Sequence, residues 1–344
     1  MATPKSGAPL VASVRAYRVA YDGRPFYGFQ RQPDVPTVED TLLDALAALD
    51  VLGGAEGGPD VDGASDADSD GDAAPTADGD RATRGGRAVP SGYAAAGRTD
   101  RGVSAVRQTV AFDAPDWLSP GAFNGELPGS VRVWAAAAVS EGFHATHDAV
   151  RRTYRYHLHA PGASPDRARA AADRLSGRHD VHNLTSDDRG PRTRRDLSVS
   201  IDAAGGEGAD SVDDPDGEDG VGDPDGATAP GEFLVLTVAA GGFPREFVRR
   251  LATLVRGVAV GDTGLDRVEA VLGEEPLSGP RGVAPASPGP LLLADVAYSG
   301  VEFEPDPDAV ASLTATFGER RVDALARGRV LGDVLAATPS EQFE

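Results

Sequence analysis

The chain of 344 residues contains no cysteine, and Lys5 is its only lysine. The absence of thiols excludes disulfides, zinc ribbons, iron–sulfur clusters and cysteine nucleophiles. No apolar run is long enough to span a membrane, and the N-terminus lacks the apolar core of a signal peptide. The sequence therefore predicts a soluble, cytoplasmic protein with no membrane association.

Acidic residues are in large excess. There are 54 of them against 33 basic residues, which gives a formal net charge of −21. A carboxylate-rich surface stays hydrated in concentrated salt, where its self-repulsion is screened, so the composition indicates a halophilic protein. GC-rich coding would also favour arginine over lysine and valine over isoleucine, so this interpretation depends on the acid excess.

Two segments concentrate the negative charge. Residues 52–80 contain nine acidic residues and residues 202–230 contain ten, with no lysine or arginine in either segment. Such segments bury too little apolar area to offset the entropy of ordering, so both are interpreted as solvated, disordered insertions. The remaining chain is close to neutral and rich in arginine.

Outside the insertions, strand and helix patterns are mixed, which predicts an α+β fold. Thr37, followed by Asp40 three residues later, is typical of a helix N-terminus. Strand patterns occupy residues 17–21, 107–113, 131–139, 152–159, 233–238 and 291–298, and helix patterns occupy residues 38–49, 164–175, 247–261, 266–273 and 307–317.

One loop carries a candidate catalytic residue. In the run GRTDRGV, residues 97–103, Asp100 lies between two glycines and is flanked by Arg98 and Arg101. Nearby cations favour the ionised carboxylate, which suits a nucleophile or base rather than a proton donor. Composition alone favours the alternative, an Asx-type turn with surface arginines.

The GRTDRGV run resembles the signature of the tRNA pseudouridine synthase A family. The resemblance continues in the family order from about residue 14 to residue 300, broken only by the two acidic insertions. The further matching segments are Tyr21–Gly23 with Phe26–Gln32, Thr37–Glu39, Leu127–Pro128 with Phe143–Ala145, Arg152–Tyr156, and Phe243–Arg249. A single match of this kind would be weak evidence for the family, whereas the whole set in the family order is strong evidence.

The resemblance assigns roles residue by residue. It implies that Asp100 is the catalytic aspartate, that Tyr154 stacks on the target base and serves in proton transfer, and that Arg249 pairs with the aspartate. Arg98 matches the arginine that replaces the flipped base in the RNA stack. The expected substrate-binding residues are Arg98, Thr99, Arg101, Arg152 and Arg155.

The resemblance also implies an architecture and a substrate. The expected pseudouridine synthase fold has two ferredoxin-like α/β halves, with mixed or antiparallel sheets joined across a central catalytic cleft. Residues 1–150 and 151–320 would form the halves and residues 321–344 a C-terminal tail. The family further implies a homodimer that binds tRNA and modifies uridines of the anticodon arm, around positions 38 to 40.

The chemistry agrees with the residues present. Isomerising uridine breaks the N1–C1′ bond and joins C5 to C1′, which requires no redox change, phosphate donor, metal or other cofactor. The sequence has no phosphate loop or dinucleotide fingerprint. A carboxylate near C1′, a wall for the detached ring and a proton acceptor suffice. Whether Asp100 attacks C1′ or removes a C2′ proton stays open.

Two other functions are weighed against this one. The six histidines fall in close pairs, His144/His147, His157/His159 and His179/His182, and paired histidines with nearby carboxylates are typical ligands of a metal-dependent hydrolase. The third possibility is a non-catalytic RNA-binding protein.

The chain also departs from the common family pattern. Arg245-Glu246 replaces a usual His-His pair, Ser104 replaces a histidine, and Thr146 stands where an arginine is common. These changes concern peripheral RNA contacts. Tyr27 and Phe29 are treated as core aromatics and are not assigned to the site.

Overall fold

The computed structural model describes residues 13–52, 83–84, 87–203 and 232–337. Both acidic insertions lie outside the described residues, except for Leu52 at the start of the first and residues 202–203 at the start of the second. The proposed disorder of these segments therefore stays a prediction.

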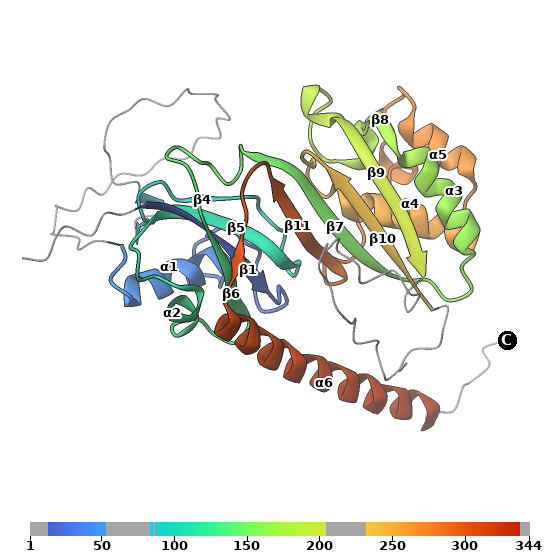
Figure 1. The fold of residues 1–344 in the computed structure, drawn as a ribbon. Helices are drawn as coiled ribbons and strands as arrows, with labels where there is room; N and C mark the ends of the chain where they lie inside the picture. The colour runs from blue at the N-terminus through green and yellow to red at the C-terminus, as the bar shows by residue number, and fades with distance from the viewer. Residues whose placement is uncertain (1–12, 53–82, 85–86, 204–231, 338–344) are drawn as a thin grey trace, which may run out of the picture.

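A ten-stranded sheet forms the centre of the described part (Figure 1). Its order is β12-β6-β1-β5-β11-β7-β10-β9-β8, with β4 paired to β5. Every pairing is antiparallel except that of β5 with β11. The strands are β1 (Ser13–Tyr21), β4 (Ala94–Ala95), β5 (Ser104–Ala114), β6 (Val131–Ala138), β7 (Ala149–His159), β8 (Gly177–Asp180), β9 (Arg194–Ala203), β10 (Phe233–Ala240), β11 (Leu291–Tyr298) and β12 (Glu304–Pro305), with β2 (Thr83–Arg84) and β3 (Arg87–Ala88) in a separate pair.

The five predicted helices begin within one residue of the expected positions, whereas the short helix at Pro120–Asn124 was not predicted. The Thr37 hydroxyl accepts a hydrogen bond from the Asp40 N–H at 3.1 Å, so Thr37 caps α1. The helices are α1 (Val38–Ala48), α2 (Pro120–Asn124), α3 (Pro165–Leu175), α4 (Phe247–Val260), α5 (Leu265–Leu272) and α6 (Pro307–Ala337), with 3-10 turns η1 (His182–Leu184), η2 (Pro191–Thr193) and η3 (Gly279–Arg281).

The last helix is longer than predicted. We expected it over residues 307–317, but α6 continues to Ala337 and projects away from the sheet (Figure 1). Gly318 interrupts the apolar period and hid the continuation. Residues 319–337 are rich in alanine, leucine, valine and arginine and contain no proline, a composition that favours helix.

Two buried clusters lie on the two parts of the sheet. One packs α1 and α2 against β1, β5 and β6, and the other packs α3, α4 and α5 against β7, β9 and β10. Strand β11 lies between β5 and β7, and it contributes Leu293 to the first cluster and Leu291 to the second. The α+β class is therefore confirmed, and a strand from late in the chain links the two parts. The domain boundary near residue 150 stays a prediction.

None of the helices in the described ranges is long and apolar enough to cross a membrane.

Candidate active site

The Asp100 loop, residues 97–103, connects β4 to β5 and is hydrogen-bonded to the Tyr21–Gln32 segment. The Thr99 carbonyl accepts the Phe29 N–H at 3.0 Å, and the Phe26 carbonyl accepts the Gly102 N–H at 3.3 Å. Gly28 has φ +110°, and a Cβ atom there would lie 2.8 Å from the Thr99 carbonyl oxygen. Only glycine permits both that conformation and that approach. Two separated motifs of the sequence therefore form one rigid unit.

Thr99 anchors this unit through its side chain. Its buried hydroxyl lies 2.8 Å from the hydroxyl of Tyr21. Burial raises the pKa of Tyr21, against the opposing hydrogen bonds from Thr99 and Gln108, so the phenol stays protonated. The hydroxyl of Thr99 thus bonds to Tyr21, while Thr99 also lines the cleft described below, and its expected contact with substrate stays a prediction.

Asp100 and Arg249 meet across the two parts of the molecule. The Arg249 Nη1 donates to Asp100 Oδ2 at 3.2 Å, while Arg249 Nε donates to the Ala286 carbonyl at 2.7 Å. The Asp100 side chain is 50% exposed, whereas that of Arg249 is 16% exposed. The arginine is thus fixed, and it pairs with a carboxylate that remains open to solvent. Arg249, rather than the neighbours Arg98 and Arg101, supplies the contacting cation.

Tyr154, in β7, forms an aromatic wall with Phe243. Their ring centroids are 5.2 Å apart and the rings lie nearly perpendicular. Burial raises the pKa of Tyr154 to about 12, with Arg152 lowering it and Asp100 raising it further. The phenol is therefore protonated at neutral pH.

These groups line a cleft of about 790 Å³, which is within the usual range for ligand sites. Both parts of the sheet contribute to its walls. The lining comes from Tyr27–Gln30, Gln32, Glu39, Tyr93–Ala95, Gly97–Arg101, Val103, His144, Thr146, Tyr154, Phe243–Arg249 and Leu291.

The expected substrate-binding arginines divide into two pairs. Arg98 and Arg101 line the cleft, and the Arg101 guanidinium lies 4.1 Å from the centre of the Tyr27 ring. Arg152 and Arg155 do not line it. Arg152 instead donates to the carbonyls of Ala96 at 2.7 Å, Thr146 at 2.8 Å and Gly241 at 2.7 Å. These hydrogen bonds fix the start of the Asp100 loop and leave Arg152 few donors for phosphate.

Many residues that line the cleft were not assigned to the site from the sequence. Tyr27, set aside as a core aromatic, is 39% exposed at the cleft, although Phe29 is buried as expected. Phe243 and Glu246 also line the cleft. All three residues lie in the matching segments Phe26–Gln32 and Phe243–Arg249, so motif membership was the signal that could have identified them.

The histidine pairs do not assemble a metal site in the part of the chain that the structure describes. No group of three or more histidine, aspartate or glutamate side chains is placed there to hold an ion. The His144 and His147 rings lie 4.2 Å apart without such a carboxylate group. The hydrolase alternative therefore has no ligand cluster among these residues.

A half-exposed carboxylate, a fixed arginine and a protonated phenol, facing one cleft, define an enzyme centre for nucleophilic or acid–base chemistry. The chain is 46% identical over 327 residues to a tRNA pseudouridine synthase A of Haloarcula marismortui, covering 92% of this chain and 97% of that protein. It is 47% identical over 330 residues to the same-named protein of Natronomonas pharaonis, covering 95% and 100%. The chain therefore belongs to the tRNA pseudouridine synthase A family and is an isomerase.

The other comparisons add less. These similar relatives come from halophilic archaea, which agrees with the acid-rich composition. No family model matches the chain. A crystal structure of an archaeal box H/ACA sRNP Nop10–Cbf5 complex is 16% identical, covers 49% of this chain and 34% of that chain, and has a TM-score of 0.23. That score is too low to support a conclusion about the fold.

Proposed function

We propose that the protein converts uridine to pseudouridine in the anticodon arm of tRNA, around positions 38 to 40, with Asp100 as the essential carboxylate. The observation that carries this proposal is the Asp100–Arg249 ion pair, 3.2 Å long, on the wall of a cleft that Tyr154 also lines. The relatives in Haloarcula marismortui and Natronomonas pharaonis are tRNA pseudouridine synthases, which supports tRNA as the substrate.

The three side chains divide the work. Asp100, half-exposed and paired with Arg249, acts on the ribose, either by attack at C1′ or by removal of a C2′ proton. Arg249 holds it in place. Tyr154 forms a wall for the detached uracil and donates a hydrogen bond, because a phenol with a pKa of about 12 keeps its proton at neutral pH. It can accept the C5 proton only after passing on its own.

Arg98 is exposed on the cleft wall, where it can enter the RNA stack as the target base leaves. Arg101, stacked on Tyr27, presents a positive charge beside it. These charges offset the overall negative charge locally, so an acidic protein can still bind phosphates. The reaction requires no cofactor, and we further propose a cytoplasmic homodimer in which tRNA touches both subunits.

The test is pseudouridine formation on unmodified tRNA transcripts in molar KCl, mapped by carbodiimide labelling and reverse transcription. Modification confined to the anticodon arm supports the proposal, and modification elsewhere overturns the assigned positions. Chelator added to the same reaction should leave the rate unchanged. Loss of activity that a divalent metal restores would favour the hydrolase-type centre instead, while binding without any product would favour a non-catalytic protein.

A further inference from the structure

Arg249 has a second carboxylate beside it. Its Nη1, which donates to Asp100 Oδ2, also lies 3.8 Å from Glu246 Oε1. Glu246 is itself fixed, because its Oε2 accepts from Arg250 Nη2 at 2.6 Å and Arg250 Nη1 donates to the Val283 carbonyl at 2.6 Å. Arg249 therefore lies near both an open aspartate and an anchored glutamate.

The backbone of Glu246 is held in an unfavourable conformation. Its φ of 56° and ψ of 4° place it in the left-handed region, just before α4 begins at Phe247. A residue with a Cβ atom adopts that region at a cost, so the surroundings must impose it. In this conformation the Glu246 side chain reaches the first turn of α4, where it lies near Arg249 and forms an ion pair with Arg250.

The loop at residues 185–189 supplies that constraint. The Thr185 hydroxyl donates to the Arg245 carbonyl at 2.9 Å, and Asp187 Oδ2 accepts the Arg245 N–H at 3.0 Å. Both polar groups of the residue before Glu246 are therefore bound from one side. The Thr185 hydroxyl also accepts the Asp187 N–H at 3.0 Å, which fixes the two side chains relative to each other.

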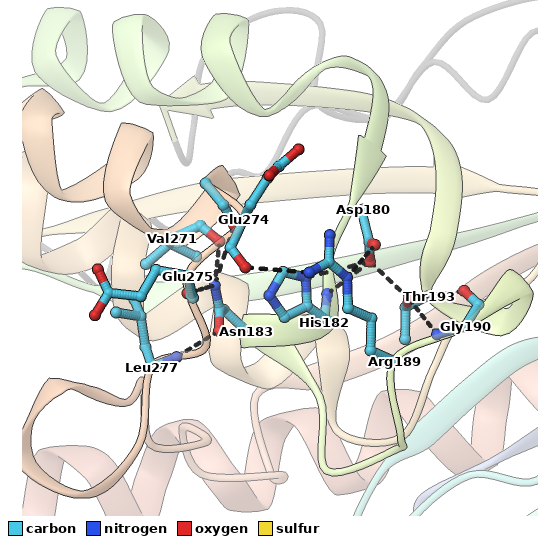
Figure 2. A network of polar contacts seen from close by, with 11 residues as sticks. Asp180, His182, Asn183, Arg189, Gly190, Thr193, Val271, Glu274, Glu275 and Leu277 are labelled. Carbon is cyan, nitrogen blue, oxygen red and sulfur yellow. Dashed lines mark hydrogen bonds and ion pairs between the residues drawn. The ribbon is translucent and has the colours of Figure 1, made fainter.

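This loop is in turn anchored to the second core (Figure 2). Asp180 accepts hydrogen bonds from Thr193 at 2.6 Å and Arg189 at 2.9 Å, so it ties the end of the loop to β8. Arg189 also donates to the Glu274 carbonyl at 3.1 Å, and the Asn183 amide donates to the carbonyls of residues 271 and 275 at 3.1 Å each. Contacts therefore lead without a break from this network through the 185–189 loop to Glu246 and Arg249 at the cleft.

We infer that Glu246, held by Asp187 and Thr185, is a positioning residue that keeps Arg249 aimed at Asp100. During turnover the charge of Asp100 changes as it reacts, and Arg249 then keeps a carboxylate partner only through Glu246. This inference rests on the proposed role of Arg249 in catalysis. It assigns a task to a glutamate at which the chain departs from the common family pattern.

The first experiment uses Glu246→Gln, which keeps an acceptor for Arg250 and removes the charge. Turnover should fall by about tenfold while the KM for tRNA stays within about twofold, because an interaction made through Arg249 affects the reacting state. The matched control is Glu269→Gln, an exposed carboxylate 3.7 Å from Arg174, which should leave both parameters unchanged. A raised KM with normal kcat would mean that Glu246 contacts RNA, and it would overturn the inference.

Two further comparisons separate the possibilities. Asp187→Asn retains an acceptor for the Arg245 N–H and should keep turnover, whereas Asp187→Ala should lower it by about threefold to tenfold. In an Arg249→Lys background, whose single ammonium lacks the guanidinium fork, Glu246→Gln should add less than about twofold. The same loss in both backgrounds would show that Glu246 does not act through Arg249.

Different results would contradict the proposed role of Arg249 and the positioning role of Glu246. If Arg249→Met turned over normally, the role of Arg249 itself would be wrong. If Arg249→Met were inactive and Glu246→Gln were as fast as the unaltered protein, only the positioning inference would be lost.

Discussion

Asp100 and Asp180 both bind an arginine, yet their surroundings suit them for opposite tasks. Asp100 is 50% exposed and has the single arginine contact at 3.2 Å, whereas Asp180 is 19% exposed and accepts from Thr193 at 2.6 Å and Arg189 at 2.9 Å. The oxygens of Asp180 are already occupied, so it stabilises a loop and has little capacity to react. Asp100 retains free acceptor capacity toward a cleft, as a nucleophile or base requires.

The largest expected effect is on turnover in Asp100→Asn. This change removes the reacting charge without altering shape, so pseudouridine formation should fall by at least about a thousandfold. Because Asp100 is half-exposed, the free energy of unfolding should change by less than about 0.5 kcal/mol. Single-turnover assays and urea unfolding in the same molar KCl buffer measure the two quantities. Residual turnover within about tenfold of the unaltered protein would remove Asp100 from the centre of the mechanism.

The second comparison concerns the Tyr154 hydroxyl. Tyr154→Phe keeps the aromatic wall against Phe243 and loses the hydrogen-bond donor, and Tyr154→Leu loses both. If the hydroxyl serves in proton transfer, Phe should bind tRNA normally and turn over about a hundredfold more slowly. The rate should also show no rise through a tyrosine titration below about pH 10, because burial raises the pKa of Tyr154 to about 12. A Phe variant of normal speed would leave Tyr154 a packing role.

Asp180→Asn should produce the opposite result to Asp100→Asn. It weakens the bonds from Thr193 and Arg189, so the free energy of unfolding should fall by about 2 kcal/mol. Turnover of the folded fraction should drop less than about tenfold, because Asp180 touches the cleft only through the 185–189 loop. If Asp180→Asn abolished turnover in a fully folded protein, the division between the two aspartates would be wrong.

The pH dependence of the free energy of unfolding tests the structural role of Asp180. Burial opposes ionisation of Asp180, but hydrogen bonds from Thr193 and Arg189 outweigh it, and the pKa is lowered to about 2. A lowered pKa contributes stability above the ordinary value near 4 that is lost as the pH falls through 2. With solvent screening, this contribution is about 1 kcal/mol between pH 4 and pH 2. The difference in unfolding free energy between the unaltered protein and Asp180→Asn should shrink by that amount over this range.

Local sequence patterns predicted the elements, whereas distant contacts could not be read from them. Asp100, Tyr154 and Arg249 were assigned from motif resemblance, and the structure brings all three to one cleft. The hydrogen bonds from Arg152 to three carbonyls were missed, because strand alternation does not reveal which carbonyls a long side chain will reach. The left-handed backbone of Glu246 was equally hidden, since it is imposed by residues about 60 positions earlier.

The smallest expected effect on turnover comes from removing most of the second acidic insertion, whose carboxylates, unlike Asp100, lie outside the matched motifs. Residues 204–231 lie outside the described part, but Ala203 and Leu234 at its two ends are paired neighbours in β9 and β10. An Asn-Gly turn can therefore replace the insertion without separating the strands. The change removes nine acidic residues, none of which lies within a matched motif, so turnover in molar KCl should stay within about twofold.

Salt dependence then tests what the insertion does. Without its negative charge, tRNA affinity should increase at low salt and converge with that of the unaltered chain in molar KCl, because repulsion of phosphates is screened there. Aggregation in high salt should rise as the solvated surface is lost. Filter binding across a KCl series compares the two proteins, with an insertion of equal length in which the acids are replaced by serine and glycine as the control for charge. Weaker tRNA binding of the shortened protein at every salt concentration would show that the insertion contacts RNA or a bound cation.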